Sequence, residues 1–360
     1  MLENKSPSQT TVEENNEMQT EVENRRVLLE IKDLDIIYSS DKSTVRAVNH
    51  LNLEVRAGET VGFVGETGAG KTTTARGILR LIPNPPGEIV NGEIIFDGQN
   101  LLTLDKEEMR KIRGGRISMI FQDPMTSLNP SMTVGKQIEE VLGLHESLEG
   151  VERTERAKEM LRLVGIKAER IDDFPHQFSG GMKQRVVIAM ALACNPQLLI
   201  ADEPTTALDV TIQAQVLKLM NELKIKLNTA MLLITHDLGV VAHTCDRVAI
   251  MYAGSVLESG TTIEIFDHPQ HPYTQGLFAS IPDLDKDTER LEVIPGMPPD
   301  PSDLPPGCCF APRCPYALDI CNRDFPETVR MEGRDHAVAC YRISHPELFD
   351  EQVKKEKQHA

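Results

Sequence analysis

The chain has 360 residues, of which 40% are hydrophobic, and it carries a formal net charge of −17 at pH 7. This acidity argues against a nucleic-acid partner, because DNA and RNA attract basic protein surfaces. The longest apolar run, Val186–Cys194, has nine residues, whereas a membrane-spanning helix needs about 20. The start is polar and acidic, without the pattern of a signal peptide. We therefore expect a cytoplasmic protein, and any membrane role would be that of a peripheral subunit.

The first part of the chain predicts a tail followed by two strands. Residues 1–26 are acidic and polar with few large apolar side chains, so we predict a disordered tail. Leu28–Tyr38 and Ala47–Val55 then alternate between apolar and polar residues, which predicts two antiparallel strands joined by a polar turn. Tyr38 ends the first strand and can stack on a nucleobase, although a half-buried structural tyrosine would give the same pattern.

A phosphate-binding loop follows an apolar run that ends at Val64. The pattern G-x-x-x-x-G-K-T begins at Gly65 and, after four intervening residues, ends with Gly70-Lys71-Thr72. The glycines let backbone N–H groups turn toward phosphate oxygens, and the helix that begins near Lys71 directs its positive end at the same anion. Lys71 adds a charge on the β- and γ-phosphates, and the Thr72 hydroxyl can ligate Mg²⁺. The predicted nucleotide-binding residues are Gly65, Glu66, Thr67, Gly68, Ala69, Gly70, Lys71, Thr72 and Thr73.

The next segments alternate between strands and helices. Gly92–Gly98 and Arg116–Gln122 are predicted strands, with a charged helix at Asp105–Arg113 between them. Gln122 stands at the carboxyl end of its strand, where ligands bind in open α/β sheets. From there it can reach Mg²⁺ or the attacking water, whereas an ordinary loop glutamine would look the same in isolation.

A helix-rich region with a second possible anion site follows. Val134–Leu144 and Arg153–Val164 show helical spacing of apolar residues. Ser179-Gly180-Gly181 then stands at the start of a helix that continues into Val186–Cys194. A hydroxyl and unpaired N–H groups at a helix start can bind phosphate, but a plain serine cap of the helix is an equal alternative.

Two buried strands carry the remaining candidate catalytic residues. Gln197–Glu203 is an apolar run that ends in adjacent carboxylates, which predicts a buried parallel strand. Asp202 is placed to hold Mg²⁺ and Glu203 to polarise the attacking water. After a helix at Val210–Leu227, the strand Ala230–Ile234 leads to His236, which can contact a γ-phosphate.

The ordered set of motifs resembles the ATP-binding subunit of ABC transporters over about residues 27–260. The resemblance implies an α/β fold: a P-loop NTPase (RecA-like) core with an antiparallel β-subdomain, an α-helical subdomain at about 124–194, and a small cysteine-containing C-terminal appendage at 261–360. It further implies that ATP is sandwiched between the P-loop of one subunit and the signature motif of its partner.

Residue roles carry over by the same resemblance. Tyr38 corresponds to the adenine-stacking aromatic, Gln122 to the Q-loop and His236 to the H-switch. The signature is Phe178-Ser179-Gly180-Gly181, in which Phe178 replaces the leucine of many members. The D-loop is Ala207-Leu208-Asp209, preceded by Thr206 where serine is usual. Asp202 and Glu203 are the Mg²⁺-binding aspartate and the catalytic base, so we expect a hydrolysis-competent site.

A narrower resemblance concerns the transported substrate. Phe121–Pro130, Asp202–Thr211 and His271-Pro272-Tyr273-Thr274 resemble the oligopeptide/dipeptide importer ATPases of the D type. Such subunits act at the cytoplasmic face of the membrane with an F-type ATPase partner, two transmembrane permease subunits and an extracellular peptide-binding protein. The alternatives are an ATPase for nickel or another small solute, and a soluble non-transport ABC ATPase. Intact Glu203 and His236 oppose a third alternative, a non-hydrolysing regulatory subunit.

The cysteines cluster near the end of the chain. Five of the seven lie at or after Cys308, and in a cytosolic protein such clustering favours metal over disulfides. Cys308, Cys314, Cys321 and Cys340 resemble the C-terminal motif of the same importer ATPases, which in some members holds a [4Fe–4S] cluster. Four thiolates also suit structural zinc, and free thiols are the third possibility. Cys309 can substitute for Cys308 or simply sit beside it, and Cys194 and Cys245 are predicted core residues.

Overall fold

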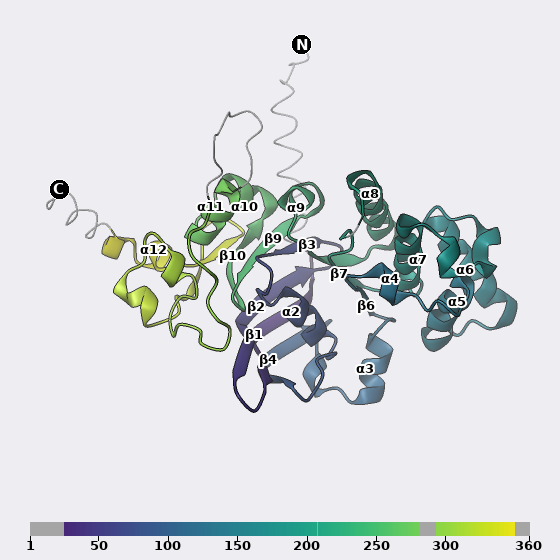
Figure 1. The fold of residues 1–360 in the computed structure, drawn as a ribbon, viewed down its shortest axis with the longest axis horizontal. Coiled ribbons are helices and arrows are strands. Elements are labelled where there is room, and N and C mark those ends of the chain that lie inside the picture. The colour runs from purple at the N-terminus through teal and green to yellow at the C-terminus, as the bar shows by residue number, and fades with distance from the viewer. Residues whose placement is uncertain (1–24, 207, 281–292, 350–360) are drawn as a thin grey trace, which may run out of the picture.

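The computed structural model describes residues 25–206, 208–280 and 293–349. The tail predicted at 1–26 therefore lies almost wholly outside the described residues. Figure 1 shows a main sheet in the middle of the molecule, a helical region at one end and the C-terminal region at the other. None of the helices in the described ranges has the length and apolar character that crossing a membrane requires.

An antiparallel sheet forms from the first predicted strands. β1 (Val27–Ser39) pairs with β2 (Thr44–Arg56) and with β4 (Gly87–Phe96), and β5 (Gln99–Asn100) adds to β4. The strand order is β2-β1-β4-β5. The two antiparallel strands expected before the P-loop are confirmed, and β4 begins earlier than the pattern at Gly92 predicted.

The main sheet has the order β11-β12-β10-β9-β3-β8-β7-β6. Its parallel part consists of β3 (Thr60–Val64), β8 (Ala230–Ile234), β7 (Leu198–Asp202), β6 (Ile117–Ile120) and β9 (Arg247–Tyr252). The antiparallel part consists of β10 (Ser255–Thr261), β12 (His336–Ala339) and β11 (Thr328–Arg330). Because parallel strands end at the same edge, the loops that follow β3, β8, β7 and β6 are neighbours.

The central strands are buried on both faces. In β8, Leu232 and Ile234 belong to the core under the antiparallel sheet, whereas Met231 and Leu233 belong to the core shared with the helices. Side chains alternate between the two faces of a strand, so a strand covered on both sides needs consecutive apolar residues. This explains why β7 and β8 appear in the sequence as unbroken apolar runs.

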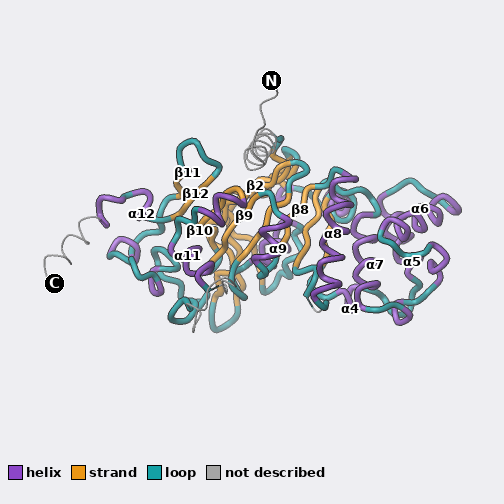
Figure 2. Tube along the Cα trace, turned by 90° about the horizontal axis from the view of Figure 1, so that it is seen from above, coloured by secondary structure: helices purple, strands orange, loops and turns teal. Residues whose placement is uncertain are grey.

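The longer helices lie at the end of the main sheet that is formed by β6. Figure 2 shows α5, α6 and α7 grouped at this end, with α8 between them and the strands. Within the described ranges the α-helices are α2 (Lys71–Ile78), α3 (Lys106–Ile112), α4 (Pro124–Ser127), α5 (Val134–His145), α6 (Gly150–Leu163), α7 (Gly180–Leu192), α8 (Val210–Leu227), α9 (Leu238–Thr244), α10 (Thr262–Asp267), α11 (Pro272–Ala279) and α12 (Tyr341–Ser344). Short 3-10 helices occupy Leu101–Thr103, Ala168–Asp172, Pro175–Gln177, Ala311–Arg313 and Asp319–Asn322.

The C-terminal region continues the main sheet. β12 pairs with β10, with Glu258 opposite Val338, and β11 pairs with β12. A buried ion network fastens this hairpin: Asp335 lies 3.1 Å from Arg56 and 2.9 Å from Arg247. Arg247 is also 3.5 Å from Glu59, whose side chain is fully buried. Asp335 of the hairpin and Glu59 of the core thus together balance the charges of Arg56 and Arg247.

We predict that Asp335→Asn lowers the free energy of unfolding by about 3 kcal/mol, because removing one partner leaves buried charges unpaired. Urea unfolding measures this. The matched control is Asp319→Asn: Asp319 is 95% exposed and 4.0 Å from Arg323, and it should leave stability unchanged. Equal, small effects of both substitutions would show that the network does not fasten the hairpin.

Candidate functional site

The predicted catalytic and nucleotide-binding residues meet at one edge of the main sheet. The P-loop follows β3, His236 follows β8, Glu203 follows β7 and Gln122 follows β6. These are four adjacent parallel strands. Gly65 and His236 therefore share one site although they are 171 positions apart in the sequence. The site lies at the edge where open α/β sheets bind ligands.

The P-loop conformation requires its glycines. A Cβ at Gly65 would collide with the carbonyl oxygen of Met251, and one at Gly70 with the carbonyl oxygen of Ala47. Gly70 also has a φ of 104°, which disfavours other residues. The loop is anchored by the Gly254 N–H, which donates to the carbonyl of Ala69 at 2.9 Å. Thr67 and Gly68 at its tip are exposed, so the loop is open toward solvent.

Lys71 lies inside the loop. Its ammonium donates to the carbonyls of Gly65 at 2.6 Å and Glu66 at 2.9 Å, and the side chain is almost fully buried. Burial lowers the pKa of Lys71, and the carboxylates of Glu203, Asp202 and Glu66 oppose this effect. A cation is thus fixed at the start of α2, where the helix end also attracts an anion.

Thr72 and Asp202 lie side by side. The Thr72 hydroxyl donates to Asp202 Oδ1 at 3.2 Å, and Asp202 is only 2% exposed. Burial raises the pKa of Asp202, and the hydrogen bond from Thr72 opposes the increase. A divalent cation would offset the cost of this buried charge, so the two oxygens fit Mg²⁺. Mg²⁺ often takes one or two carboxylates together with phosphate and water, which suits a site that lacks a full protein cage.

The carboxylate of Glu203 is the centre of a hydrogen-bonded cluster. Its Oε2 accepts from Thr206 at 2.8 Å and from Gln122 at 3.0 Å, and its Oε1 is 3.3 Å from His236 Nδ1. Burial alone would raise the pKa of Glu203, but the bonds from Thr206, His236 and Gln122 outweigh it and the pKa is lowered. Glu203 also adopts a φ of 46°, a conformation that costs free energy in a residue with a side chain and marks a functional position.

The signature segment does not behave as an ordinary helix cap. The Ser179 side chain makes no capping hydrogen bond to the helix that begins at Gly180, and both residues are exposed. α7 packs against α4, α5, α6, α8 and β6, whereas α2 packs against β1, β2 and β7. Gly181 approaches Ile212 of α8 so closely that a Cβ there would lie 2.7 Å from a methyl carbon. The segment therefore presents an open helix start on a different side of the sheet from α2.

Tyr38 and Asp209 have simpler surroundings. Tyr38 is half-buried, and its ring lies beside Gly87 of β4. Asp209 caps α8, because its side chain accepts from the Ile212 N–H at 3.0 Å. Ala207 of the predicted D-loop lies outside the described residues. The adenine-stacking role of Tyr38 and the D-loop role of Asp209 stay predictions.

The four spaced cysteines line one small cavity. Cys308, Cys314, Cys321 and Cys340 surround a volume of about 20 Å³ together with Phe310, Tyr341 and Arg342. All seven cysteines are free thiols. Burial raises the pKa of Cys308 to about 12 and that of Cys340 to about 11. Thiolates are thus disfavoured without a cation.

This cysteine arrangement does not fit the metal that the resemblance implies. The residue types are those of an iron–sulfur or zinc site, but in the described ranges no three Cys, His, Asp or Glu side chains are placed to hold a metal ion. The cavity also holds about one water molecule, which is too little space for a four-iron cluster. Both expected metals therefore lack support in this geometry.

Comparison with known proteins agrees with the arrangement of the site. Residues 48–206 match the family described as ABC transporter, and residues 257–321 match the family described as oligopeptide/dipeptide transporter, C-terminal region. The oligopeptide transport ATP-binding protein OppD of Bacillus subtilis (strain 168) is 56% identical over 296 residues, which cover 81% of this chain and 83% of OppD. The chain belongs to the family of ABC transporter ATP-binding proteins.

Further relatives and solved structures extend this result. OppD of Salmonella typhimurium is 50% identical over 86% of this chain and 92% of its own length. The dipeptide transport ATP-binding protein DppD of Bacillus subtilis is 49% identical, and the match covers 87% of this chain and 94% of DppD. The dimeric ATP-binding cassette MJ0796, in a post-hydrolysis state with ADP and Pi, is 30% identical with a TM-score of 0.59 and covers 65% of this chain and 99% of that one. The core is thus that of an ABC-type P-loop ATPase.

The structure adds contacts of this ABC ATPase that sequence reasoning missed. Thr206 stands where serine is usual before the D-loop, and its hydroxyl donates to the carboxylate of Glu203. Gln184 of α7 is fully buried and donates to the carbonyl of Pro204 at 2.6 Å, so the signature helix is tied to the loop after Glu203. Tyr273 and Arg313 contact the P-loop residue Glu66. Nothing local in the sequence signals the last two contacts.

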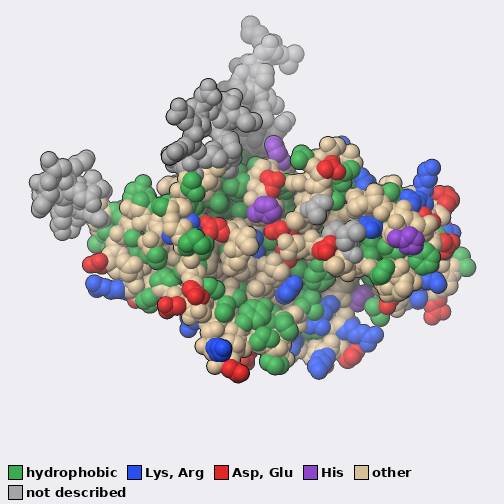
Figure 3. Space-filling model, in the orientation of Figure 1, with side chains coloured by type: hydrophobic (Ala, Val, Ile, Leu, Met, Phe, Trp, Pro, Cys, Tyr) green, Lys and Arg blue, Asp and Glu red, His purple; other side chains and the backbone are tan. Residues whose placement is uncertain are grey.

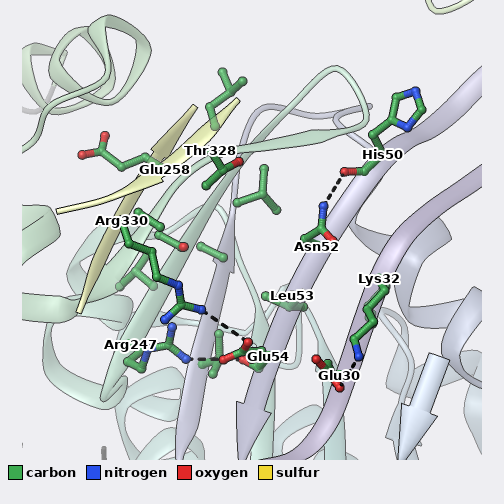
Figure 4. Close-up of a pocket in the computed structure, with 18 of the residues that line it drawn as sticks. Glu30, Lys32, His50, Asn52, Leu53, Glu54, Arg247, Glu258, Thr328 and Arg330 are labelled. Atoms are coloured by element: carbon green, nitrogen blue, oxygen red, sulfur yellow. Dashed lines mark hydrogen bonds and ion pairs between the residues drawn. The ribbon is translucent and has the colours of Figure 1, made fainter. Parts of the chain in front are cut away.

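A separate cavity of about 450 Å³ lies between the two sheets (Figure 4). Charged side chains surround it: Arg330 donates to Glu54 at 3.3 Å, and Lys32 pairs with Glu30 at 3.1 Å. None of residues 65–73 lines it, so it is distinct from the nucleotide site. On the face shown in Figure 3, acidic and basic side chains are interspersed.

We predict that Thr206→Val narrows the pH range of ATPase activity. The hydroxyl lowers the pKa of Glu203, so its removal raises that pKa and the carboxylate becomes protonated at a higher pH. The acidic limb of the pH–rate profile should therefore move to higher pH, whereas Thr206→Ser keeps the hydroxyl and should keep the profile. Superimposable profiles for the two variants would show that this bond does not tune Glu203.

Proposed function

We propose that this chain is the ATP-hydrolysing subunit of an ABC importer that powers the uptake of oligopeptides or dipeptides across the cell membrane. The observation that carries the proposal is the double match, to the ABC transporter family at 48–206 and to the peptide-transporter C-terminal region at 257–321. Relatives named for oligopeptide and dipeptide transport match over more than 80% of the chain. This favours peptides over nickel or another small solute, and a transporter over a non-transport ABC ATPase.

In the proposed reaction the P-loop and Lys71 bind the triphosphate, and Thr72 and Asp202 hold Mg²⁺. When bound, Mg²⁺ neutralises charge on the phosphates. Glu203 accepts a proton from the attacking water, since its lowered pKa keeps it ionised as a base at neutral pH. Gln122, Thr206 and His236 fix its orientation, and His236 also contacts the γ-phosphate. Tyr38 stacks on the adenine.

The nucleotide site is proposed to need a second subunit. The exposed start of α7 and the open P-loop tip both suit a partner surface, and the related cassette MJ0796 is dimeric. ATP would lie between this P-loop and the partner's signature, while Ser179, Gly180, Gly181 and Asp209 face the partner's nucleotide. We propose an F-type ATPase subunit as that partner, two transmembrane permeases, an extracellular peptide-binding protein, and peripheral attachment at the cytoplasmic face.

The proposal includes no step at the cysteine cavity. A [4Fe–4S] cluster or Zn²⁺ at Cys308, Cys314, Cys321 and Cys340 stays a prediction from resemblance, because a metal would have to displace the protons of buried thiols and enlarge the cavity. Iron, sulfide and zinc should be measured on anaerobically purified protein and on a Cys314→Ser/Cys321→Ser variant. About one cluster or ion per chain, lost in the variant, would support a metal site, and absence of all three would leave four structural thiols.

We predict that Glu203→Gln binds MgATP as well as the wild type but hydrolyses it about 10²- to 10⁴-fold more slowly, since general-base catalysis contributes a factor of this size. The uptake of labelled peptides into vesicles that contain the complete transporter should fall by the same factor. Exposed Glu107→Gln is the control and should match the wild type. Undiminished turnover would contradict the role of Glu203, and uptake of nickel but not of peptides would contradict the substrate class.

A further inference from the structure

We propose that Arg313 is a positioning residue of the nucleotide site: it holds the carboxylate of the P-loop residue Glu66 away from the bound phosphates. The inference rests on the proposed function, because it assumes that the P-loop binds MgATP. It assigns a role to the C-terminal region, which no motif of the ATPase core requires.

The geometry at Arg313 is specific. One guanidinium nitrogen, Nη1, lies 3.1 and 3.2 Å from the two carboxylate oxygens of Glu66. The other nitrogens are used as well: Nε donates to the Pro295 carbonyl at 3.0 Å and Nη2 to the Ile294 carbonyl at 3.2 Å. The Arg313 side chain is only 7% exposed. Because a planar guanidinium with several fixed acceptors has little freedom, the position of the Glu66 carboxylate is determined by the C-terminal region.

A second contact joins the same two parts of the chain. The backbone N–H of Glu66 donates to the Tyr273 hydroxyl at 3.3 Å. Tyr273 packs against Tyr252 with ring centroids 4.6 Å apart, and Phe310 packs on both tyrosines at 5.4 Å. The Tyr252 hydroxyl in turn accepts from Arg313 at 3.2 Å. Tyr273 thus holds the backbone of Glu66 and Arg313 holds its side chain, and both belong to one buried cluster of packed aromatic rings.

The charge of Glu66 explains why such a contact is needed. Its carboxylate belongs to the loop that binds a triphosphate, and an unpaired negative charge there would repel the ligand. Arg313 cancels that charge and directs it toward the C-terminal region. Within the described residues, no hydrogen bond or ion pair joins the Glu66 carboxylate to Lys71, whose ammonium donates to the carbonyls of Gly65 and Glu66 and is assigned to the triphosphate in the proposed reaction.

The origin of these residues identifies the C-terminal region as part of the site. Tyr273 and Arg313 both fall within 257–321, which matches the peptide-transporter C-terminal region, and outside 48–206, which matches the ABC transporter family. In Figure 1 this region, which includes most of β10 and all of α10 and α11, lies at the end of the main sheet away from α5, α6 and α7. The P-loop is therefore supported by residues outside the segment that matches the ABC transporter family.

A double-mutant cycle tests the proposal on the full chain. MgATP dissociation constants are measured for the wild type, Arg313→Gln, Glu66→Gln and the double variant, with thermal unfolding of each. Arg313→Gln should weaken MgATP binding by about five- to thirty-fold, because it exposes the phosphates to an unpaired carboxylate. In the Glu66→Gln background, which has no carboxylate for Arg313 to hold, adding Arg313→Gln should change binding by less than about threefold, so the double variant should bind more tightly than Arg313→Gln alone. The control is Arg330→Gln, which removes an exposed arginine of the same region that contacts Glu54 and should bind normally.

The MgATP affinities of the four proteins decide whether Arg313 positions Glu66. Normal binding by Arg313→Gln, or weak binding that Glu66→Gln fails to restore, would overturn the proposal, since a purely structural role predicts no such rescue. If Arg313→Gln does not fold, the cycle is run with Arg313→Met, which keeps an apolar stem of similar length but removes the charge that faces Glu66. Weakened binding restored by Glu66→Gln supports the proposal, and unchanged binding overturns it. Failure of the wild type and Arg330→Gln to bind MgATP would instead refute the proposed function.

Discussion

The structure depends on one constraint: four adjacent parallel strands must end at the same edge of the sheet. Only then can Gln122, Thr206 and His236, which come from loops after β6, β7 and β8, converge on the carboxylate of Glu203. The P-loop after β3 lies at the same edge. The burial of these strands on both faces is what fixes their register, because a shift by one residue would exchange the side chains of the two cores. The packing of the strands therefore determines the geometry around Glu203, the predicted catalytic base.

The nucleotide site has two unequal sides. Toward the C-terminal region it is closed within the chain, since Tyr273 and Arg313 hold Glu66. Toward solvent the P-loop tip is open, and the exposed start of α7 belongs to a helix that packs with the helical region rather than beside the P-loop helix α2. In the proposed dimer, such a subunit would support its own P-loop from within the chain and leave the open side of the nucleotide to a partner.

Local patterns predicted much of this arrangement. The consecutive apolar residues of β7 and β8 indicated strands buried on both faces, and the glycines of the P-loop indicated its backbone conformation. The Glu203 position followed from a strand that ends in two carboxylates. The contacts of Arg313, Tyr273 and Gln184 could not be predicted, because each joins segments that are distant in the sequence and carry no local signature.

The C-terminal region shows where sequence patterns fall short. The clustering of its cysteines and their resemblance to a known motif predicted that four of them share a site, and the structure does bring these four to one cavity. Spacing says nothing about distance between sulfur atoms or about cavity size, however, and the expected metal is not supported. The pairing of β12 with β10 was also missed, since the short strand His336–Ala339 is stabilised by the buried Asp335 network rather than by a periodic pattern.

The central claim, that a second subunit completes the site, is tested most directly by a structure of the assembled Glu203→Gln transporter with MgATP. The account predicts that the triphosphate at Lys71 and Thr72 is covered on its open side by the signature segment of a second ATPase subunit. Ser179, Gly180 and Gly181 of this chain should then cover the nucleotide of that partner. ATP bound at this P-loop with its open side in solvent, or covered by the same chain's own signature, would contradict the account.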